Sequence, residues 1–387
     1  MDLDSINRLI LRKHHLTEES KIDDIVQIAD DLCGLHATSA TTPYLSLFAR
    51  TRSFHKDDLY NALYGEKLLG RIRCMRNTIH ILTRKMIPVA LAATRDKAMD
   101  ISRKFVESRG VSWRQYEEVS ESIAGLLREK EMTASEIKKA LGWDRDISAI
   151  LYLMCDSAVL IRGRPAGSWR SRNHKYALLK DYFPHMEPRK MGEREATIAL
   201  VRMHLRTYGP AAVTDIAWWA GQGKTRVREA LDDIQEDIEE TDVPDIKGRL
   251  CMFASDREML DDQTINKPVV NLLPVLDPYL MGYKQRERYL ADEYYGYVFD
   301  RSGNGTSTIL IDGRVAGVWD MEEGEEPTVK LLLFEEAPKK IRESIEAGAI
   351  EVGRFIVEGD VGARWCDSMI PLTKRTAGSM MSPLKGC

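Results

Sequence analysis

The residues best suited to chemistry in this sequence lie in a basic segment near its middle. Between positions 157 and 180 there is no Asp or Glu, although the whole chain has a net charge of −4. Guanidinium and ammonium groups at this density neutralise phosphates, which supplies most of the sequence-independent affinity for nucleic acid. A solvated face without a ligand is the alternative interpretation. The residues expected to contact DNA here are Arg162, Arg164, Trp169, Arg170, Arg172 and Lys175.

Two smaller basic groups are candidates for the same role. One opens a predicted helix and consists of Lys224, Arg226 and Arg228. The other consists of Arg71, Arg73 and Arg76 and lies along a predicted strand. Alternation of side chains along a strand puts Arg71 and Arg73 on one face. Arg73 and Arg76 are the candidates for DNA contact in this group, and protection of an exposed sheet edge is an equally good interpretation of its charges.

These basic groups fall within a pattern of three helices and a hairpin that occurs three times, as expected for winged helices. The second copy is the clearest. Helices are predicted at 117–130, from 133 and at 146–158, and the second of them opens with a capping box from Thr133 to Glu136. Strands at 159–161 and 175–179 then enclose a wing at 162–174. The basic segment is this wing.

We therefore predict an α+β protein with three tandem winged-helix modules followed by a C-terminal β-barrel-like domain. The expected modules span 1–115 (with N-terminal helices), 116–192 and 193–266, and the C-terminal domain spans 267–387 with a loose tail from 376. Strands in that domain are expected at 269–276, 294–299, 307–311, 315–319, 329–334 and 351–357, with a helix at 338–347.

Composition is that of an ordinary globular protein, with 43% hydrophobic and 30% charged residues among 387. No run of 18 apolar residues and no N-terminal apolar signal segment is present, so we expect a cytoplasmic protein, nucleoid-associated when bound to DNA. The six cysteines are scattered, without zinc-ligand spacing, and reduced thiols are expected. No Walker A, G-x-G-x-x-G, H-E-x-x-H or G-x-S-x-G motif occurs. Trp218 and Trp219 are expected in the core, with base stacking as the alternative.

Five landmarks, in order along the chain, resemble the AlkZ/YcaQ family of winged-helix DNA glycosylases. The resemblance implies three tandem winged helices around a concave basic channel, closed by a C-terminal β domain. It also implies excision of alkylated purines, and for some members the unhooking of interstrand crosslinks, without metal or nucleotide cofactor. The partner would be double-stranded DNA, alkylated or crosslinked, and the protein a monomer. The landmarks are 34–38, 75–80, 209–221, 272–283 and 311–319.

The same resemblance assigns candidate catalytic residues. The family uses a Q-x-Q or Q-x-D motif to hold water and stabilise the sugar cation, and His36 and Thr38 occupy its two positions. A histidine can orient or deprotonate water near neutral pH, and a threonine can hydrogen-bond it. His80 matches a family histidine and is a third candidate, although the preferred interpretation is a structural histidine packed behind the hairpin and bonded to backbone.

Two functions are compatible with the presence of His36 and Thr38 at the positions of the family's Q-x-Q or Q-x-D motif. The first is a monofunctional DNA glycosylase that hydrolyses the N-glycosidic bond of alkylated purines with a diverged His-x-Thr pair. The second is a catalytically inactive or altered winged-helix DNA-binding protein, such as a regulator or lesion binder. A protein-interaction scaffold is a third interpretation, since winged helices also bind proteins.

Overall fold

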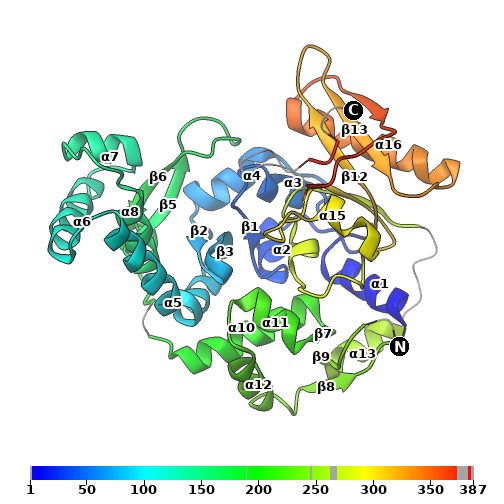
Figure 1. The fold of residues 1–387 in the computed structure, drawn as a ribbon, viewed down its shortest axis with the longest axis horizontal. Helices are drawn as coiled ribbons and strands as arrows, with labels where there is room; N and C mark the ends of the chain where they lie inside the picture. The colour runs from blue at the N-terminus through cyan, green and yellow to red at the C-terminus, as the bar shows by residue number, and fades with distance from the viewer. Residues whose placement is uncertain (1, 189, 245, 262–267, 373–381, 385–387) are drawn as a thin grey trace.

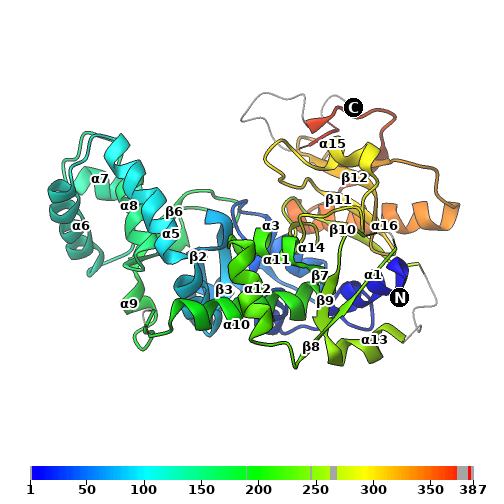
Figure 2. The ribbon, with the colours of Figure 1, turned by 60° about the horizontal axis from the view of Figure 1, so that its bottom comes forward.

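The computed structural model describes residues 2–188, 190–244, 246–261, 268–372 and 382–384. Helices α6 (Trp113–Leu127) and α7 (Ala134–Ala140) lie at one end of the molecule, and α16 (Lys339–Val357) lies at the other (Figures 1 and 2). No helix in the described ranges is long and apolar enough to cross a membrane. Most of the expected loose tail, residues 376–381 and 385–387, lies outside the described residues.

The first segment, residues 1–115, surrounds three short strands with helices. Strand β1 (Leu35–His36) pairs with β3 (Ile79–Thr83), which pairs with β2 (Leu69–Arg73), all antiparallel. A 3₁₀ turn, η2 (Met75–Asn77), joins β2 to β3. The helical elements are α1 (Leu3–Lys13), α2 (Ile25–Asp31), α3 (Thr42–Phe48), α4 (Lys56–Tyr60), the π-turn η1 (Asn61–Gly65) and α5 (Met86–Ser108).

The second segment, residues 116–192, begins inside α6 and is built around one hydrophobic core, to which Val106 and Val111 of the first segment contribute. The predicted capping box is confirmed: Thr133 Oγ1 accepts from the backbone N–H of Glu136, whose carboxylate accepts from that of Thr133. The remaining elements are β4 (Met132–Thr133), α8 (Ser148–Asp156), β5 (Leu160–Pro165), β6 (His174–Leu178) and α9 (Leu179–Tyr182).

The first two segments share one sheet. Its strand order is β1-β3-β2-β5-β6-β4, and the two halves join where Arg71 of β2 pairs with Arg162 of β5. Strand β2 therefore lies inside the sheet. The interpretation of Arg71 and Arg73 as protection of a sheet edge is wrong for this reason, since the candidate edge is covered by the wing strand of the next segment.

The third segment, residues 193–266, packs helices against a small sheet of order β7-β9-β8. Its residues belong to the same large core as those of the first segment and the C-terminal region. The elements are α10 (Glu193–Tyr208), β7 (Ala211–Ala212), α11 (Val213–Ala220), α12 (Lys224–Asp232), β8 (Ile238–Thr241), β9 (Leu250–Phe253), η3 (Ala254–Asp256) and α13 (Arg257–Asp261).

The C-terminal region forms an open sheet, and the expected barrel is not closed. Its strand order is β10-β11-β12-β13-β14, and β14 pairs parallel to β13. Apolar residues of α16 pack on one face of this sheet, which buries that face without closure of the sheet. The elements are β10 (Val270–Leu273), α14 (Pro278–Met281), η4 (Asp292–Tyr294), α15 (Tyr295–Val298), β11 (Thr308–Ile311), β12 (Arg314–Glu322), β13 (Thr328–Leu333) and β14 (Gly362–Trp365).

Two strand predictions in this region are wrong. Residues 351–357 continue α16, because the buried positions Ile345, Ala349, Val352 and Ile356 recur at helical spacing. Residues 294–299 form a 3₁₀ turn and a short helix instead of a strand. Their aromatic and β-branched composition favours a strand, and tertiary packing overrides that preference.

A fully buried ion pair fixes the C-terminal region against the first segment. The guanidinium of Arg50 donates to both carboxylate oxygens of Asp277, at 2.9 and 2.7 Å, and both side chains have no exposed surface. Ser46 Oγ donates to the same carboxylate at 2.7 Å. Asp277 also caps α14 by accepting from the backbone N–H of Tyr279. Bidentate pairing of this kind offsets the cost of burying two charges.

We expect Asp277→Asn to destabilise the protein by about 3–5 kcal/mol, because it leaves the Arg50 guanidinium buried without a counter-charge. The free energy of unfolding from urea denaturation measures this effect. Glu118→Gln is the control, since it breaks an exposed pair with Arg114 on α6 and should leave the midpoint unchanged. A loss below about 1 kcal/mol for Asp277→Asn would contradict the structural role assigned to the pair.

Candidate active site

His36 is placed by a glycine that allows two strands to approach closely. Gly34 precedes β1 with a φ of +96°, and a Cβ at this position would lie 2.4 Å from Leu82 Cδ2 and 3.1 Å from Ile81 O. A larger residue there would separate β1 from β3. The resulting register sets His36 directly opposite His80, and their ring centroids are 5.1 Å apart. The two candidate histidines therefore face the same side of the sheet.

The η2 turn places Arg76 beside this histidine pair. Arg76 and Asn77 adopt left-handed backbone conformations, with φ of 52° and 59°, which returns the chain from β2 to β3. The guanidinium of Arg76 lies over the ring of Trp218 on α11, 3.8 Å from its centroid. Among the expected DNA-contacting residues, Arg76 is the one that the structure brings to His36.

Both histidines are held in the neutral form. Burial lowers the pKa of His36 well below 6.5, and His80 and Arg76 add to the effect. Burial likewise lowers the pKa of His80 to about 4, again with a contribution from Arg76. His80 Nδ1 lies 3.7 Å from the Cys74 thiol. His36 is 3% exposed, and neither of its ring nitrogens has a hydrogen-bond partner within the described residues.

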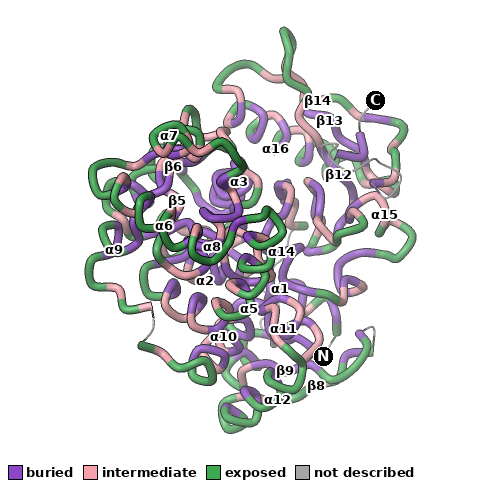
Figure 3. Tube along the Cα trace, turned by 60° about the vertical axis from the view of Figure 1, so that its left-hand side comes forward, coloured by how far each residue is buried: buried purple, intermediate pink, exposed green. Residues whose placement is uncertain are grey.

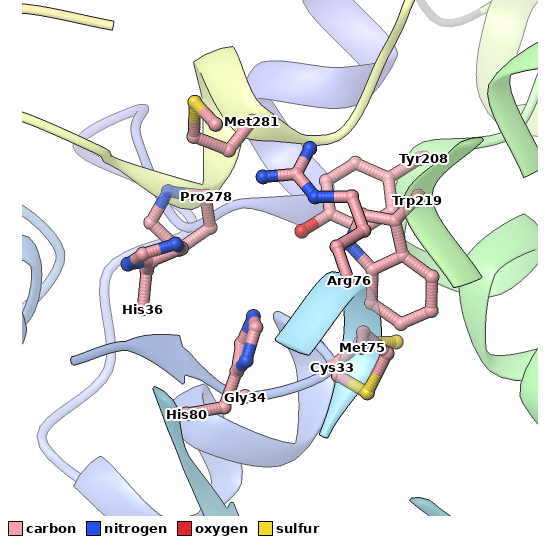
Figure 4. Close-up of a pocket in the computed structure, with 10 residues that line it drawn as sticks. All are labelled: Cys33, Gly34, His36, Met75, Arg76, His80, Tyr208, Trp219, Pro278 and Met281. Atoms are coloured by element: carbon pink, nitrogen blue, oxygen red, sulfur yellow. The ribbon is translucent and has the colours of Figure 1, made fainter. Parts of the chain in front are cut away.

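A cavity of about 10 Å³ lies between these side chains, which is roughly the room for one water molecule. Its walls come from the first segment, the third segment and the C-terminal region, as Figure 4 shows. The lining residues are Cys33, Gly34, His36, Met75, Arg76, His80, Tyr208, Trp219, Pro278 and Met281. His36, His80 and Arg76 supply polar nitrogen atoms to this otherwise largely apolar and aromatic lining.

Thr38 lies just outside the cavity. It is exposed, and its Oγ1 accepts a hydrogen bond from the backbone N–H of Ile79 at 3.4 Å.

Cys33, Cys74, Cys155 and Cys251 are free, as expected, whereas Cys366 is disulfide-bonded and so departs from the expectation of reduced thiols. Within the described ranges no cluster of three or more His, Cys, Asp or Glu side chains is suited to a metal ion.

The strand arginines already have partners inside the protein. Arg73 donates to Asp156 at 2.5 Å and to Ser102 at 3.0 Å, and its side chain is 16% exposed. Arg71 is buried and contacts His174 Nε2 at 3.1 Å. The structure does not bring Arg73 to the cavity, since it lies beside α8 of the second segment.

The predicted wing residues divide into paired and free side chains. Arg164 forms an ion pair with Glu131 at 2.7 Å, and the Arg162 guanidinium lies 5.8 Å from the rings of Tyr152 and Tyr176. Lys175 is half-buried on β6, and Arg172 is exposed at the tip of the wing. Arg172 forms no hydrogen bond or ion pair with any residue that the structure describes. It is therefore available to a phosphate.

The tip of the wing contacts the first segment and the C-terminal helix. The Trp169 ring lies 5.0 Å from Tyr44 and 6.1 Å from Phe355 of α16. Arg170 forms an ion pair with Glu323 at 2.7 Å and donates to the carbonyl oxygen of Ile356 near the C-terminus of α16. These two predicted DNA contacts are thus occupied within the protein.

The basic residues of α12 lie apart from the cavity. Lys224, Arg226 and Arg228 are all exposed on a helix at the rim of the molecule, which Figure 3 shows largely in green. Arg226 forms an ion pair with Glu193, while Lys224 and Arg228 are free of ion pairs among the described residues.

Sequence reasoning missed the aromatic and apolar walls of the cavity. Tyr208 and Trp219 come from the third segment, and Met281 comes from α14. Trp219 is 5% exposed and belongs to the core as expected. The landmarks at 209–221 and 272–283 mark these segments, but nothing in them indicates that they meet at His36.

Comparison with known proteins identifies the family. A model of the family described as "DNA glycosylase AlkZ-like" matches residues 29–355 of this chain. The chain is 23% identical over 338 residues to the "Interstrand DNA cross-link repair glycosylase" of Streptomyces sahachiroi, a match that covers 84% of this chain and 88% of that protein. The structure of the Streptomyces sahachiroi DNA glycosylase AlkZ has the same fold, with a TM-score of 0.77, 21% identity, and coverage of 95% of this chain and 100% of that one. The chain belongs to the AlkZ-like DNA glycosylase family.

Proposed function

We propose that this protein is a monofunctional DNA glycosylase that excises alkylated purines from double-stranded DNA by hydrolysing the N-glycosidic bond. One observation carries the proposal: the buried, unpartnered ring nitrogens of His36 line a cavity with room for one water molecule. A buried polar group without a partner is costly, and such groups are retained most often where function requires them. His36 thus replaces the first glutamine of the family motif.

A neutral imidazole suits this reaction. An alkylated purine carries positive charge, so it leaves readily and the enzyme needs only to orient the water and stabilise the sugar cation. His36 accepts a hydrogen bond from the water, and the hydroxyl of Thr38, two residues along the chain, donates one. His80 holds the His36 ring in place by packing against it at 5.1 Å. No metal or nucleotide is required.

The same proposal covers the DNA-binding surface. The three segments 1–115, 116–192 and 193–266 act as winged-helix modules that present Arg172, Lys175, Lys224 and Arg228 to phosphates. Because a related glycosylase from Streptomyces sahachiroi is named for repair of interstrand crosslinks, crosslinked DNA is a second substrate to test.

The alternative function, a DNA-binding protein without base excision, is favoured by one observation. His36 is only 3% exposed, and the cavity has room for a water but not for a purine. Incubation with duplex DNA that contains 7-methylguanine or 3-methyladenine separates the two functions. Base release supports the glycosylase. No release at a large enzyme excess, with intact DNA binding, supports the alternative.

We expect His36→Ala to lower the rate of base release by about 100-fold or more, because it removes the group that accepts the hydrogen bond of the water in this proposal. Affinity for the same duplex should change less than threefold, on the order of what a buried side chain outside the DNA contact contributes. His36→Gln is the matched variant and should retain most activity, since its amide oxygen also accepts. Equal losses of activity and binding would argue against a chemical role.

The rate of base release should be independent of pH between about 8 and 6. The lowered pKa of His36 keeps the ring neutral over this range, so its acceptor nitrogen is lost only at lower pH. A histidine of ordinary pKa would instead lose about fourfold of its neutral form by pH 6. Single-turnover kinetics at saturating enzyme measure the profile, and a midpoint near 6.5 would overturn this assignment of His36.

Substitution of Arg172 by Ala should weaken binding to duplexes of any sequence and reduce the slope of log K against log salt by about 0.9, as expected for one lost phosphate contact. Arg170→Ala is the comparison, because Glu323 and Ile356 already occupy that guanidinium. It should change the slope less. Fluorescence anisotropy over a salt series gives both values, and an unchanged slope for Arg172→Ala would exclude the wing tip from the DNA contact.

A further inference from the structure

Two arginines that lie near one indole ring, one buried and one half-buried, lack a counter-charge among the residues that the structure describes. Arg76 lies 3.8 Å from the centroid of Trp218, and Arg286 lies 5.6 Å from the same centroid. Arg286 is 6% exposed and Arg76 is half-buried. Neither forms an ion pair with a carboxylate among the residues that the structure describes. Each guanidinium therefore carries its charge within a largely dry environment.

Three other arginines lie beside a carboxylate, whereas buried Arg71 contacts the neutral His174. Arg50 pairs with Asp277, and Arg73 pairs with Asp156. Arg288, 1% exposed, lies 3.9 Å from the carboxylate of Asp215. Arg76 and Arg286 differ from Arg71 in that two uncompensated cations are neighbours, and since burying unpaired charge is expensive, such a pair is expected to receive negative charge from a ligand.

The hydrogen-bonding groups of the two arginines support the same conclusion. Arg286 donates only to neutral oxygens, those of the Tyr295 hydroxyl and the Gly303 carbonyl, both at 2.9 Å, and its Nε has no partner. Arg76 Nη1 is buried and also without a partner. Burial lowers the pKa of Arg76 to about 10, and the nearby charge of Arg286 adds to the effect; Arg76 still stays charged at neutral pH.

The position of the pair indicates which anion it takes. Arg76 lines the same cavity as His36, and Trp218 adjoins the cavity residue Trp219. In DNA, a sugar held at His36 is covalently joined to a phosphodiester on either side. We propose that Arg76 and Arg286, which both lie near Trp218, form the binding site for one phosphodiester flanking the nucleotide whose base is excised.

This site deepens the proposed function and rests on it. A phosphodiester between the two guanidinium groups neutralises the charge that disfavours a sugar cation near His36. The same phosphate fixes which nucleotide of the strand is presented to the cavity. Arg76 and Arg286 are therefore positioning residues for the DNA strand, and His36 and Thr38 handle the water.

The test measures binding to a duplex with a tetrahydrofuran abasic analogue, in which methylphosphonates replace the flanking phosphates one at a time. We expect a single position at which the uncharged linkage weakens wild-type binding by roughly 10-fold, the scale of a charged hydrogen bond. Arg76→Gln should bind the unmodified duplex about 10-fold more weakly and be insensitive to methylphosphonate at that position. Persistent sensitivity in the variant, or none in the wild type, would overturn the site.

Arg342→Gln is the matched control, because Arg342 also lies over an indole, that of Trp365, at 4.3 Å, but on the surface of α16. It should leave the methylphosphonate pattern unchanged. Arg76→Gln should also raise or preserve the melting temperature of the DNA-free protein, since it removes an unpaired buried charge. A marked fall in the melting temperature would indicate a structural role instead.

Two further outcomes are distinguishable. Stabilisation by inorganic phosphate that depends on Arg76, without methylphosphonate sensitivity in DNA, would assign the site to a free anion and overturn the phosphodiester. Because only binding is measured, the result does not depend on base release, so an inactive protein still gives a clear answer. Failure of the wild type to bind any duplex would overturn the proposed function as well as this site.

Discussion

The arrangement of the site depends on the buried ion pair between Arg50 and Asp277. Asp277 immediately precedes α14, whose residues Pro278 and Met281 form one wall of the cavity. Arg50 follows α3, which comes directly after the strand that carries His36. The distance between these two charges therefore sets how closely the C-terminal region approaches the histidine. Asp215 of α11 acts similarly by accepting from the backbone N–H groups of Lys284 and Gln285. Fixed charge pairs, more than apolar packing alone, align the three walls.

Local features of the fold could be predicted from the sequence because they depend on residues a few positions apart. The capping box at Thr133 and the hairpins at 69–83 and 160–178 have this character. The errors arise where composition and long-range packing disagree. Residues 351–357 are rich in β-branched and aromatic side chains, yet they continue a helix that covers the C-terminal sheet. Whether that sheet closes into a barrel is decided by this helix, and no local pattern reports it.

The site shows the same division. His36, Thr38, His80 and Arg76 lie in two short landmarks that the sequence makes visible. The register of β1 on β3 brings His36 and His80 to one cavity, and the η2 turn adds Arg76. The burial of His36 and the walls supplied by Tyr208, Trp219 and Met281 depend on contacts between distant segments. The charge density of the wing is equally visible in the sequence. The partners of its arginines are not, because Glu131, which pairs with Arg164, and Glu323, which pairs with Arg170, lie far from them in the sequence. Charge counts predict a basic surface and not which of its cations are free.

The sheet that joins the first two segments also limits how this chain can have been assembled. The second segment is built around one hydrophobic core, so it resembles a domain that recombination can transfer between genes. Its strand β5, however, pairs with β2 of the first segment, and each strand protects an edge of the other. Recombination that transferred only one segment would expose the backbone N–H and C=O groups of a strand to other chains, which promotes aggregation. The two segments are therefore inherited together, and diversification within this architecture proceeds through loops and side chains, as at the position of His36.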